Sequence, residues 1–323
     1  MVRLSIGIMA YNEGANIGRL LDSLLAQRNT ICSIDEICVV ASGCTDDTET
    51  VVDKYTHIDN RVKLLIQKER EGKASAINSF LSMANGNILI LAGADTVLEK
   101  NTVENLIKPF SDPIVGMTGG RPVPVNSADN FIGFTVNLLW NMHHRVALEH
   151  PKMGELVAFR NIVKTIPHDT AVDEASIEAI IIKLGYRLKY VDDAIVYNKG
   201  AENVGDFLKQ RRRIAAGHLH LRLSQGYTVS TTSWRTVLKP FLKEIRWGGK
   251  SISWTVGAVF LELYARFLGY YDFYIRKKNP FIWDVASSTK RLEKTTSDIH
   301  NDINRTAYRA SEQSRPRHDE SEE

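Results

Sequence analysis

The sequence predicts a doubly wound α/β fold, followed by helices that suit a membrane surface. Strand and helix patterns alternate through the first half of the chain, and residues 88–92 form an unbroken apolar run. Such a run is typical of a strand buried on both faces of a parallel sheet. The chain has 323 residues, 43% of them hydrophobic, and three cysteines. This composition excludes a disordered, collagenous or disulfide-stapled protein.

The first half supplies the expected strand–helix units. Strands are predicted at 4–10, 37–41, 62–66 and 88–92. Helices are predicted at 17–25, from the end of the loop at 42–47 to residue 52, and at 75–84. In a doubly wound sheet, ligands bind beyond the carboxyl ends of the strands. Three polar loops, at 11–13, 42–46 and 93–95, follow predicted strands in this way. Their convergence on one edge is the first indication of a functional site.

The second half continues the sheet and then becomes helical. Strands are predicted at 117–122, 156–160, 188–191 and 195–197, and helices at 131–148, 173–184 and 206–224. The helix at 173–184 is followed by Gly185, the residue type that most often follows a last helical turn.

The region from Lys199 to Lys278 is strongly basic and favours an anionic partner. It contains fifteen lysines and arginines against five aspartates and glutamates. Phosphate, nucleic acid and a membrane surface all attract such a region. A nucleic-acid partner is disfavoured because the basic residues alternate with apolar faces that suit lipid.

Two segments of this region predict membrane attachment. An amphipathic helix near 234–247 has an apolar face, a basic face and a tryptophan at each end, which is typical of an interfacial helix. A surface helix packed on its own domain is the alternative. Residues 251–275 are long enough to span a bilayer or re-enter it, although Glu262, Arg266 and Asp272 make this costly. The alternative there is a soluble core helix.

Three regions are expected: a catalytic domain at 1–228, an interface helix with a membrane-embedded segment at 229–283, and a flexible polar tail at 284–323. The tail is polar, of mixed charge and poor in large apolar residues, which favours a flexible or peripheral segment.

Seven short motifs follow one another along the chain, at 5–13, 42–48, 72–78, 93–96, 154–160, 173–174 and 210–213. In this order they resemble the motifs of glycosyltransferase family 2, in the branch of cellulose and hyaluronan synthases and of archaeal membrane mannosyltransferases. The resemblance implies the GT-A fold, a doubly wound mixed sheet, and inverting transfer of a sugar from a nucleotide donor.

The resemblance places donor contacts in the first loops. It assigns Ala10, Tyr11 and Glu13 to the base and ribose, and Ser42 occupies a position where many relatives carry an acid. Asp46 either contacts the nucleoside or caps the following helix. Two further residues are expected to contact the donor, Lys73 and Ala94. Lys73 begins a predicted helix, and a helix N-terminus favours phosphate. For Lys73, a solvated lysine is the alternative.

Asp95 is the predicted ligand of Mg²⁺ or Mn²⁺, because a carboxylate can hold a cation on the donor diphosphate. The alternative role is a helix cap or turn. The family pattern is Asp-x-Asp, and Gly93 occupies its first position here. One carboxylate is therefore lost from the motif, although magnesium can bind through one carboxylate together with phosphate oxygens and water.

Glu174 is the predicted catalytic base, and Asp173 is expected to orient the acceptor or to share this role. Both carboxylates begin a helix, so capping alone is the alternative. Gln210 and Arg213 share a helix face and match the Gln-x-x-Arg-Trp motif, which predicts that Arg213 binds the leaving diphosphate. Arg211 and Arg212 are expected to face solvent, headgroups or an anionic acceptor.

The acceptor side is predicted from the segment that begins at Gly154 and Glu155, which resembles the loop lining the acceptor pocket. Ile214 replaces the family tryptophan that stacks an acceptor sugar. This replacement, with the shortage of candidate membrane spans, disfavours a processive synthase.

The sequence thus predicts a metal-dependent glycosyltransferase at the cytoplasmic face of the cell membrane. It would move a single hexose, such as mannose from GDP-mannose or the sugar of a UDP-sugar, to a lipid-linked acceptor. The alternatives are a processive polysaccharide synthase and an inactive module that binds nucleotide sugar or lipid.

Overall fold

The computed structural model describes residues 1–230, 233–244, 249–277 and 287–290. The chain divides into two units, Met1–Leu292 and Glu293–Glu323, and all described residues belong to the first. Most of the predicted tail at 284–323 lies outside the described residues, with 287–290 as the exception.

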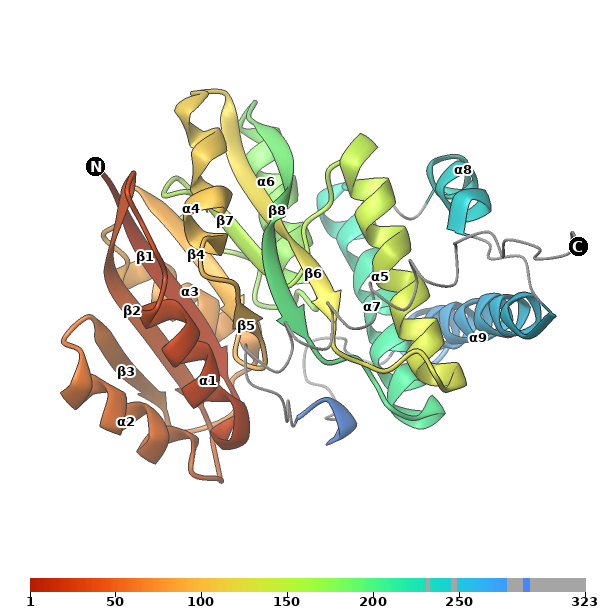
Figure 1. Cartoon of the computed structure of the whole chain (residues 1–323), viewed down its shortest axis with the longest axis horizontal. Coiled ribbons are helices and arrows are strands. Elements are labelled where there is room, and N and C mark those ends of the chain that lie inside the picture. Colours follow the sequence, from red (N-terminus) through yellow and green to blue (C-terminus); the bar gives the residue numbers. More distant parts are fainter. Residues whose placement is uncertain (231–232, 245–248, 278–286, 291–323) are drawn as a thin grey trace, which may run out of the picture. The chain divides into compact units, whose positions relative to one another are not determined.

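Within the described residues, eight strands form one mixed sheet in the order β3-β2-β1-β4-β7-β6-β8-β5 (Figure 1). Their bounds are β1 Val2–Ala10, β2 Cys32–Ser42, β3 Val62–Gln67, β4 Ile88–Gly93, β5 Val97–Leu98, β6 Val115–Pro124, β7 Leu156–Arg160 and β8 Arg187–Asn198. The first four long strands pair in parallel, whereas β7 runs antiparallel to both β4 and β6. The prediction of a doubly wound mixed sheet is confirmed.

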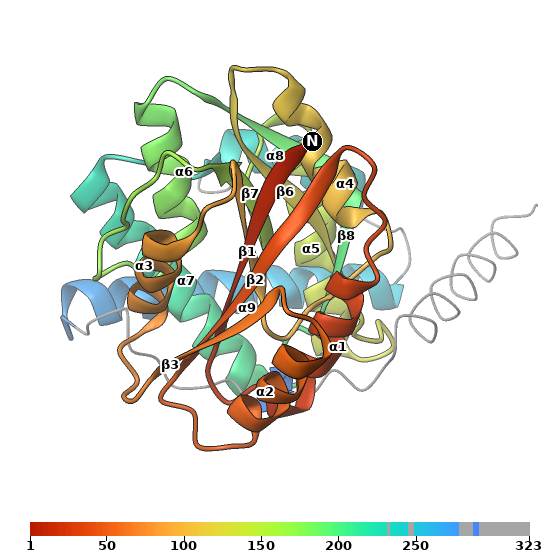
Figure 2. The ribbon, with the colours of Figure 1, turned by 90° about the vertical axis from the view of Figure 1, so that its left-hand side faces the viewer.

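Helices cover both faces of this sheet (Figure 2). Their bounds are α1 Gly14–Leu25, α2 Thr48–Ile58, α3 Lys73–Met83, α4 Thr102–Ile107, α5 Phe131–Glu149, α6 Asp173–Lys183, α7 Val204–Gln225, α8 Trp234–Glu244 and α9 Gly249–Tyr274. Apolar side chains of α1, α2 and α4 share one buried cluster with β1 and β4, and those of α3 and α6 share another with β4 and β7. Because β4 is apolar on both faces, it contributes to both clusters.

One sheet prediction was wrong: the strands expected at 188–191 and 195–197 are one strand, β8. The polar pair Asp192 and Asp193 interrupts the apolar pattern, but both side chains are exposed at an irregularity of the ladder. There the partner of β6 jumps from Tyr190, opposite Gly119, to Ile195, opposite Arg121. A bulge of this kind tolerates exposed polar residues without ending the strand. The short elements β5 and α4 were not predicted.

The membrane segment predicted at 251–275 is not supported. These residues lie in α9, and among the described helices none combines the length and the apolar character needed to cross a bilayer. The charged side chains Glu262 and Asp272 of α9 form ion pairs with arginines of α7. Glu262 accepts hydrogen bonds from Arg211 at 2.6 and 2.7 Å, and Arg212 pairs with Asp272 at 2.6 Å. Arg211 and Arg212, which were expected to face solvent or headgroups, therefore join two helices.

Close approach of α7 and α9 depends on Gly269. A Cβ atom added there would lie 2.7 Å from Ala215 Cβ and 2.8 Å from the carbonyl oxygen of Arg212. Because a backbone atom cannot move aside cheaply, we expect Gly269→Ala to lower the free energy of unfolding by about 1–3 kcal/mol. Gly249→Ala on the same helix is the control, since no neighbouring atom of the described residues lies within 4 Å of its added Cβ. Equal denaturation midpoints for both variants would contradict this packing.

Candidate active site

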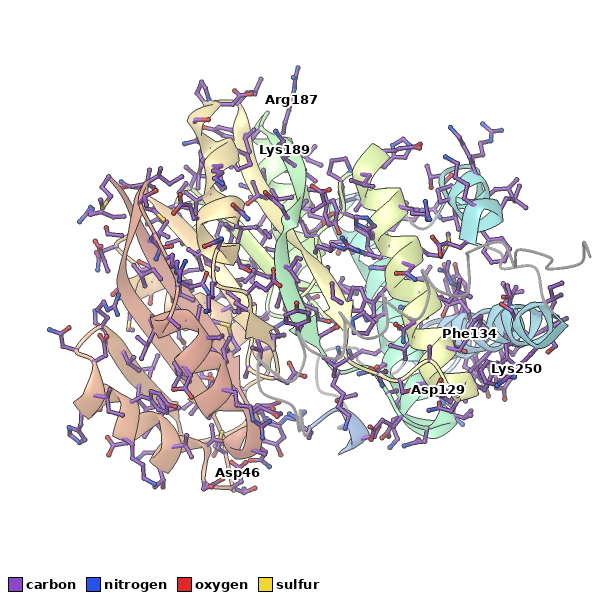
Figure 3. All side chains as sticks on the ribbon, in the orientation of Figure 1. Asp46, Asp129, Phe134, Arg187, Lys189 and Lys250 are labelled. Atoms are coloured by element: carbon purple, nitrogen blue, oxygen red, sulfur yellow. The ribbon has the colours of Figure 1, made fainter. Side chains whose placement is uncertain are left out.

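The carboxyl ends of β1, β2 and β4 bring three predicted donor loops to one edge of the sheet. Ala10 pairs with Ala41, and Met9 pairs with Gly93, so the three strands end side by side. Asp46 lies at this edge, whereas Arg187 and Lys189 lie at the opposite one (Figure 3). The predicted convergence of the loops at 11–13, 42–46 and 93–95 is therefore present.

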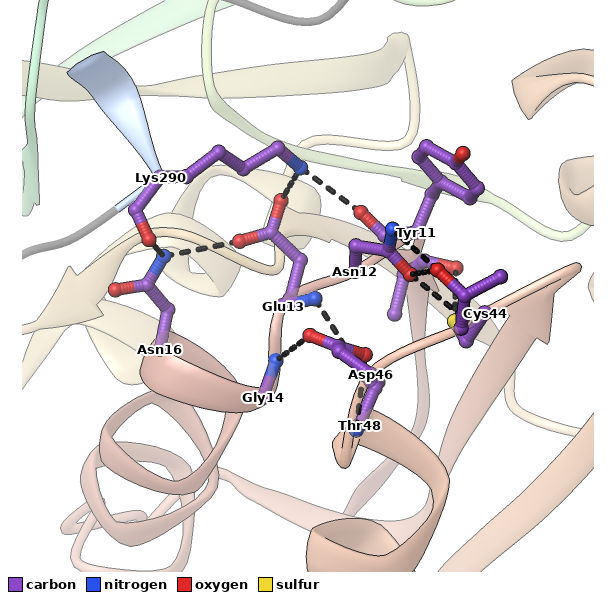
Figure 4. A network of polar contacts seen from close by, with 11 residues as sticks. Tyr11, Asn12, Glu13, Gly14, Asn16, Cys44, Asp46, Thr48 and Lys290 are labelled. Atoms are coloured by element: carbon purple, nitrogen blue, oxygen red, sulfur yellow. Dashed lines mark hydrogen bonds and ion pairs between the residues drawn. The ribbon is translucent and has the colours of Figure 1, made fainter. Parts of the chain in front are cut away.

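Asp46 and Asn12 tie the first two loops together (Figure 4). The Thr45 amide donates to Asn12 Oδ1 at 2.8 Å, and the Gly14 amide donates to Asp46 Oδ2 at 3.0 Å. Burial raises the pKa of Asp46, but hydrogen bonds from Thr48 and Gly14 outweigh it and lower the value. The carboxylate of Asp46 is thus engaged by amides at the start of both α1 and α2.

Ser42 has a comparable local role. Its hydroxyl accepts from the Glu71 amide at 3.3 Å and lies 3.4 Å from the Glu69 carbonyl oxygen. The side chain thereby holds the loop that leads into α3 and Lys73.

The sequence analysis missed Lys290, which belongs to the segment 287–290 but contacts the first loop (Figure 4). Its ammonium pairs with Glu13 and donates to the Tyr11 carbonyl oxygen at 2.9 Å, and its own carbonyl accepts from Asn16 at 2.7 Å. Burial and the charge of Asp95 raise the pKa of Glu13 to about 7, against the effect of Lys290. Nothing in the pattern of a polar tail distinguishes this lysine from its neighbours.

Asp95 and Glu155 approach each other at the position that Gly93 leaves open. A Cβ atom added to Gly93 would lie 3.1 Å from Asp95 Oδ1 and 3.6 Å from Glu155 Oε2. Asn198 Nδ2 lies 3.4 Å from the other oxygen of Glu155. Burial and then the charge of Asp95 raise the pKa of Glu155 to about 7. Among the described residues, no group of three or more histidine, cysteine or acidic side chains could hold a metal.

The two acids at the start of α6 meet Lys73 across the cleft. Lys73 Nζ lies 2.8 Å from Glu174 Oε1 and 3.3 Å from Asp173 Oδ2. Although burial opposes it, the cation of Lys73 lowers the pKa of Glu174. Asp173 is more buried, and burial raises its pKa. Glu174 is therefore the acid of this pair that is held ionised.

A cavity of about 660 Å³ begins at this lysine and these acids. Seven of the predicted site residues line it, namely Lys73, Gly154, Glu155, Asp173, Glu174, Gln210 and Arg213. Arg213 also lowers the pKa of both acids of α6. The other predicted residues, Ala10, Tyr11, Glu13, Ser42, Asp46, Ala94 and Asp95, lie outside the cavity lining. The candidate site thus has two parts, the sheet edge and the cavity, and they meet at Glu155 and Lys73.

Glu178 also lines the cavity, one turn after Glu174 on α6. It accepts from the Met153 amide and from the Tyr227 hydroxyl, both at 2.8 Å. Burial raises its pKa to about 7 from an ordinary value of 4.5.

This buried carboxyl predicts a pH-dependent stability. Between pH 4.5 and about 7 the folded protein keeps a proton that the unfolded chain releases, so the free energy of unfolding falls as the pH rises. Glu178→Gln removes this contribution and should flatten the decline of the melting temperature between pH 5 and 7.5. The exposed Glu149→Gln is the control and should retain the wild-type slope. An unchanged slope in Glu178→Gln would contradict the assignment.

Comparison with known proteins identifies the class to which this fold and this site belong. Residues 5–163 match the family model described as Glycosyl transferase family 2. This part of the chain, about half of its length, belongs to the family that the seven motifs resemble, a family of glycosyltransferases.

Among curated relatives, glycosyltransferase AglE of Haloferax volcanii is 23% identical over 239 residues, which are 68% of this chain and 73% of AglE. Glycosyltransferase GlyG of Streptococcus pneumoniae is 27% identical over 133 residues, so the match spans only 43% of GlyG.

Among solved structures, the mannosyltransferase PcManGT from Pyrobaculum calidifontis, in complex with GDP-Man and Mn²⁺, has a TM-score of 0.56 at 23% identity. The match covers 82% of this chain and 76% of that one. The glucosyl-3-phosphoglycerate synthase from Mycobacterium tuberculosis has a TM-score of 0.50 at 18% identity, over 71% of this chain and 82% of that one. At such identities the likeness shows the GT-A fold.

Proposed function

We propose that the protein transfers a single hexose, with inversion, from a nucleoside-diphosphate sugar to a lipid-linked acceptor. The nucleoside would lie on the loops that follow β1 and β2, where Tyr11 carries the Arg70 guanidinium 4.1 Å above its ring. GDP-mannose is the first donor to test, because PcManGT was solved with it. The second solved relative contains UDP-glucose, which makes UDP-sugars the next candidates.

Asp95 would hold a divalent cation, Mg²⁺ or Mn²⁺, with Glu155 in the place of the carboxylate that Gly93 lacks. The fit rests on one oxygen of Asp95 and one of Glu155, which both lie within 4 Å of the position that a Cβ atom on Gly93 would occupy. Magnesium and manganese accept such hard oxygen ligands, and Mg²⁺ is commonly held by one or two carboxylates with substrate phosphates. When bound, the cation would supply charge stabilisation to the departing diphosphate.

Glu174 would take the proton from the attacking acceptor hydroxyl. Direct displacement at the anomeric carbon needs one base and a stabilised leaving group, and it inverts the configuration at that carbon. Of the two acids of α6, Glu174 has the more exposed carboxyl group. Asp173 would orient the acceptor from its buried position.

Lys73 couples the two halves of the reaction in this proposal. It begins α3, and its ammonium pairs with Glu174. Donor phosphates would compete for this cation, as they do for lysines at helix N-termini. Glu174, once it shares Lys73 with phosphate, would become more basic and better able to accept a proton.

Membrane attachment belongs to the same proposal. Helix α9 leaves several large apolar side chains exposed, among them Phe260, Leu263 and Phe267, and α8 carries Lys239 and Lys243. We place the protein on the cytoplasmic face of the cell membrane through these helices, because an exposed apolar surface beside basic residues suits an anionic interface.

The single observation that carries the proposal is the meeting of Lys73, Asp173 and Glu174 opposite the acids Asp95 and Glu155. The test is a panel of radiolabelled GDP- and UDP-sugars with extracted membrane lipids, in the presence of Mg²⁺, Mn²⁺ or EDTA. We expect one donor to label a lipid product by a single hexose in mass spectra, and EDTA to abolish the labelling.

The outcomes separate the proposal from its rivals. A ladder of product masses would favour a processive synthase. Donor binding without transfer to any lipid, under every metal condition, would favour an inactive binding module. Retention of the donor's anomeric configuration in the NMR spectrum of the product would contradict direct displacement.

A further inference from the structure

The loop before β7 places a cation inside the cavity, and none of the proposed steps uses it. Lys152 is half-buried and lines both the large cavity and a neighbouring one of about 50 Å³. Within the described part of the chain it has neither a hydrogen bond nor an ion pair. Because a lysine drawn out of bulk water without a partner is unfavourable, this side chain requires an explanation.

The surroundings of Lys152 are also rich in positive charge. Arg211 and Arg266 line the same two cavities, together with His218, a neutral hydrogen-bonding group because burial lowers its pKa well below the ordinary value. Both arginines share a single carboxylate, that of Glu262. Burial and then the charge of Arg211 lower the pKa of Lys152 to about 8. The nearby carboxyl groups of Glu262 and Glu178 oppose this effect, but the three cations outnumber them, so a further anion bound here would relieve the repulsion among the cations.

Lys152 lies close to the catalytic acids. Its neighbour Met153 donates its amide to Glu178 at 2.8 Å, and Glu178 follows Glu174 by one turn on the same face of α6. Lys152 and Glu174 also line the same cavity, so one ligand in it could contact both side chains.

The far side of the cavity is apolar. It is formed by side chains of α5, α8 and α9, among them Leu138, Met142, Leu238, Phe241, Ala258 and Leu263. Leu238 and Leu263 are about half exposed, so this part of the wall reaches the surface. The polar and apolar parts together would suit a ligand with a charged head and a hydrocarbon chain.

We infer that Lys152, with Arg211, Arg266 and His218, binds the phosphate of an acceptor in which a sugar is joined through phosphate to a long apolar chain. The order of groups in such a molecule matches the order along the cavity: the sugar hydroxyl at Glu174, the phosphate at Lys152 and the chain between α5, α8 and α9. This inference rests on the proposed function, since it names the acceptor of the same site.

The test compares three probes that differ by one part each. Dodecyl phosphoryl-glucose carries all three groups, dodecyl glucoside lacks the phosphate, and glucose 1-phosphate lacks the chain. Binding is measured by titration calorimetry on the full chain, below the micelle concentrations of the lipids. We expect the complete probe to bind about 10- to 100-fold more tightly than either partial probe, as for one charge-assisted contact or more.

Variants assign this preference to Lys152. Lys152→Met should remove the advantage of dodecyl phosphoryl-glucose over dodecyl glucoside without lowering the melting temperature, because an unpaired cation is replaced by an apolar chain. Lys152→Arg should retain most of it. Lys183→Met, at the exposed end of α6, is the matched control and should behave as the wild type.

Each outcome is decisive. Equal binding of the two dodecyl probes, or an undiminished phosphate preference in Lys152→Met, would overturn the subsite while leaving the proposed glycosyl transfer intact. If the complete probe binds as expected but receives sugar from no nucleotide donor, the subsite is supported and the proposed function is refuted.

Discussion

Glu174→Gln should reduce sugar transfer by about 10²- to 10⁴-fold while the nucleotide sugar still binds. A positioned general base contributes a factor of this size, and glutamine keeps the shape of the side chain but cannot accept the proton. In the variant Lys73 would lose the negative charge that lies 2.8 Å from its ammonium but would keep Asp173. We expect the loss in kcat, measured by product formation under saturating donor, with little change in the donor Kd from calorimetry.

Asp173→Asn is the comparison variant for this prediction. Asp173 is buried, and within the described residues its Oδ1 has no hydrogen-bond partner, so it is placed to contact the acceptor rather than solvent. A positioning role predicts a higher acceptor KM with a smaller fall in kcat. If Glu174→Gln retained turnover and Asp173→Asn lost it, the assignment of the base would be reversed.

Asp95→Asn should lower kcat/KM by about 10²- to 10³-fold and remove the dependence of donor binding on Mn²⁺. The reason is the loss of charge stabilisation at the departing diphosphate, which is among the largest single contributions in such sites. The measurement is donor affinity by calorimetry with Mn²⁺ and with EDTA. For the wild type we expect a clear difference between these conditions, and for the variant none.

Two further variants bracket the prediction for Asp95. Glu155→Gln should weaken the Mn²⁺ dependence to an intermediate degree, since Asp95, the main proposed ligand, remains. Asp193→Asn lies on the exposed bulge of β8 and should leave both activity and metal dependence unchanged. Full Mn²⁺ dependence in Asp95→Asn would show that the cation binds elsewhere.

The parts of the fold that local pattern determines were predictable from the sequence. The alternating apolar residues of β1 and the unbroken apolar run of β4 predicted two strands of the sheet. The polar loops that follow these strands predicted the edge at which the site lies, and Asp95 was predicted from its position just after β4. The bulge in β8 was not predictable, because Asp192 and Asp193 read as a break between strands when the partner strand is unknown.

The remaining features depend on contacts between distant segments. In the sequence, Glu262 and Asp272 of α9 indicated only that inserting this segment into a membrane would be unfavourable. Their partners, Arg211 and Arg212, lie some fifty to sixty residues earlier, on α7. The approach of Glu155 to Asp95 likewise required the antiparallel placement of β7 beside β4. No local pattern reports such pairings.

The central claim is that a cation on Asp95 and the carboxylate of Glu174 face the same sugar nucleotide from two sides. A crystal structure of the chain with sugar nucleotide and Mn²⁺ tests it most directly, through the anomalous scattering of manganese. The account predicts a manganese peak at coordination distance from Asp95 and the diphosphate, with Glu174 on the opposite side of the anomeric carbon. A peak away from Asp95, or a sugar whose anomeric carbon is turned away from Glu174, would contradict it.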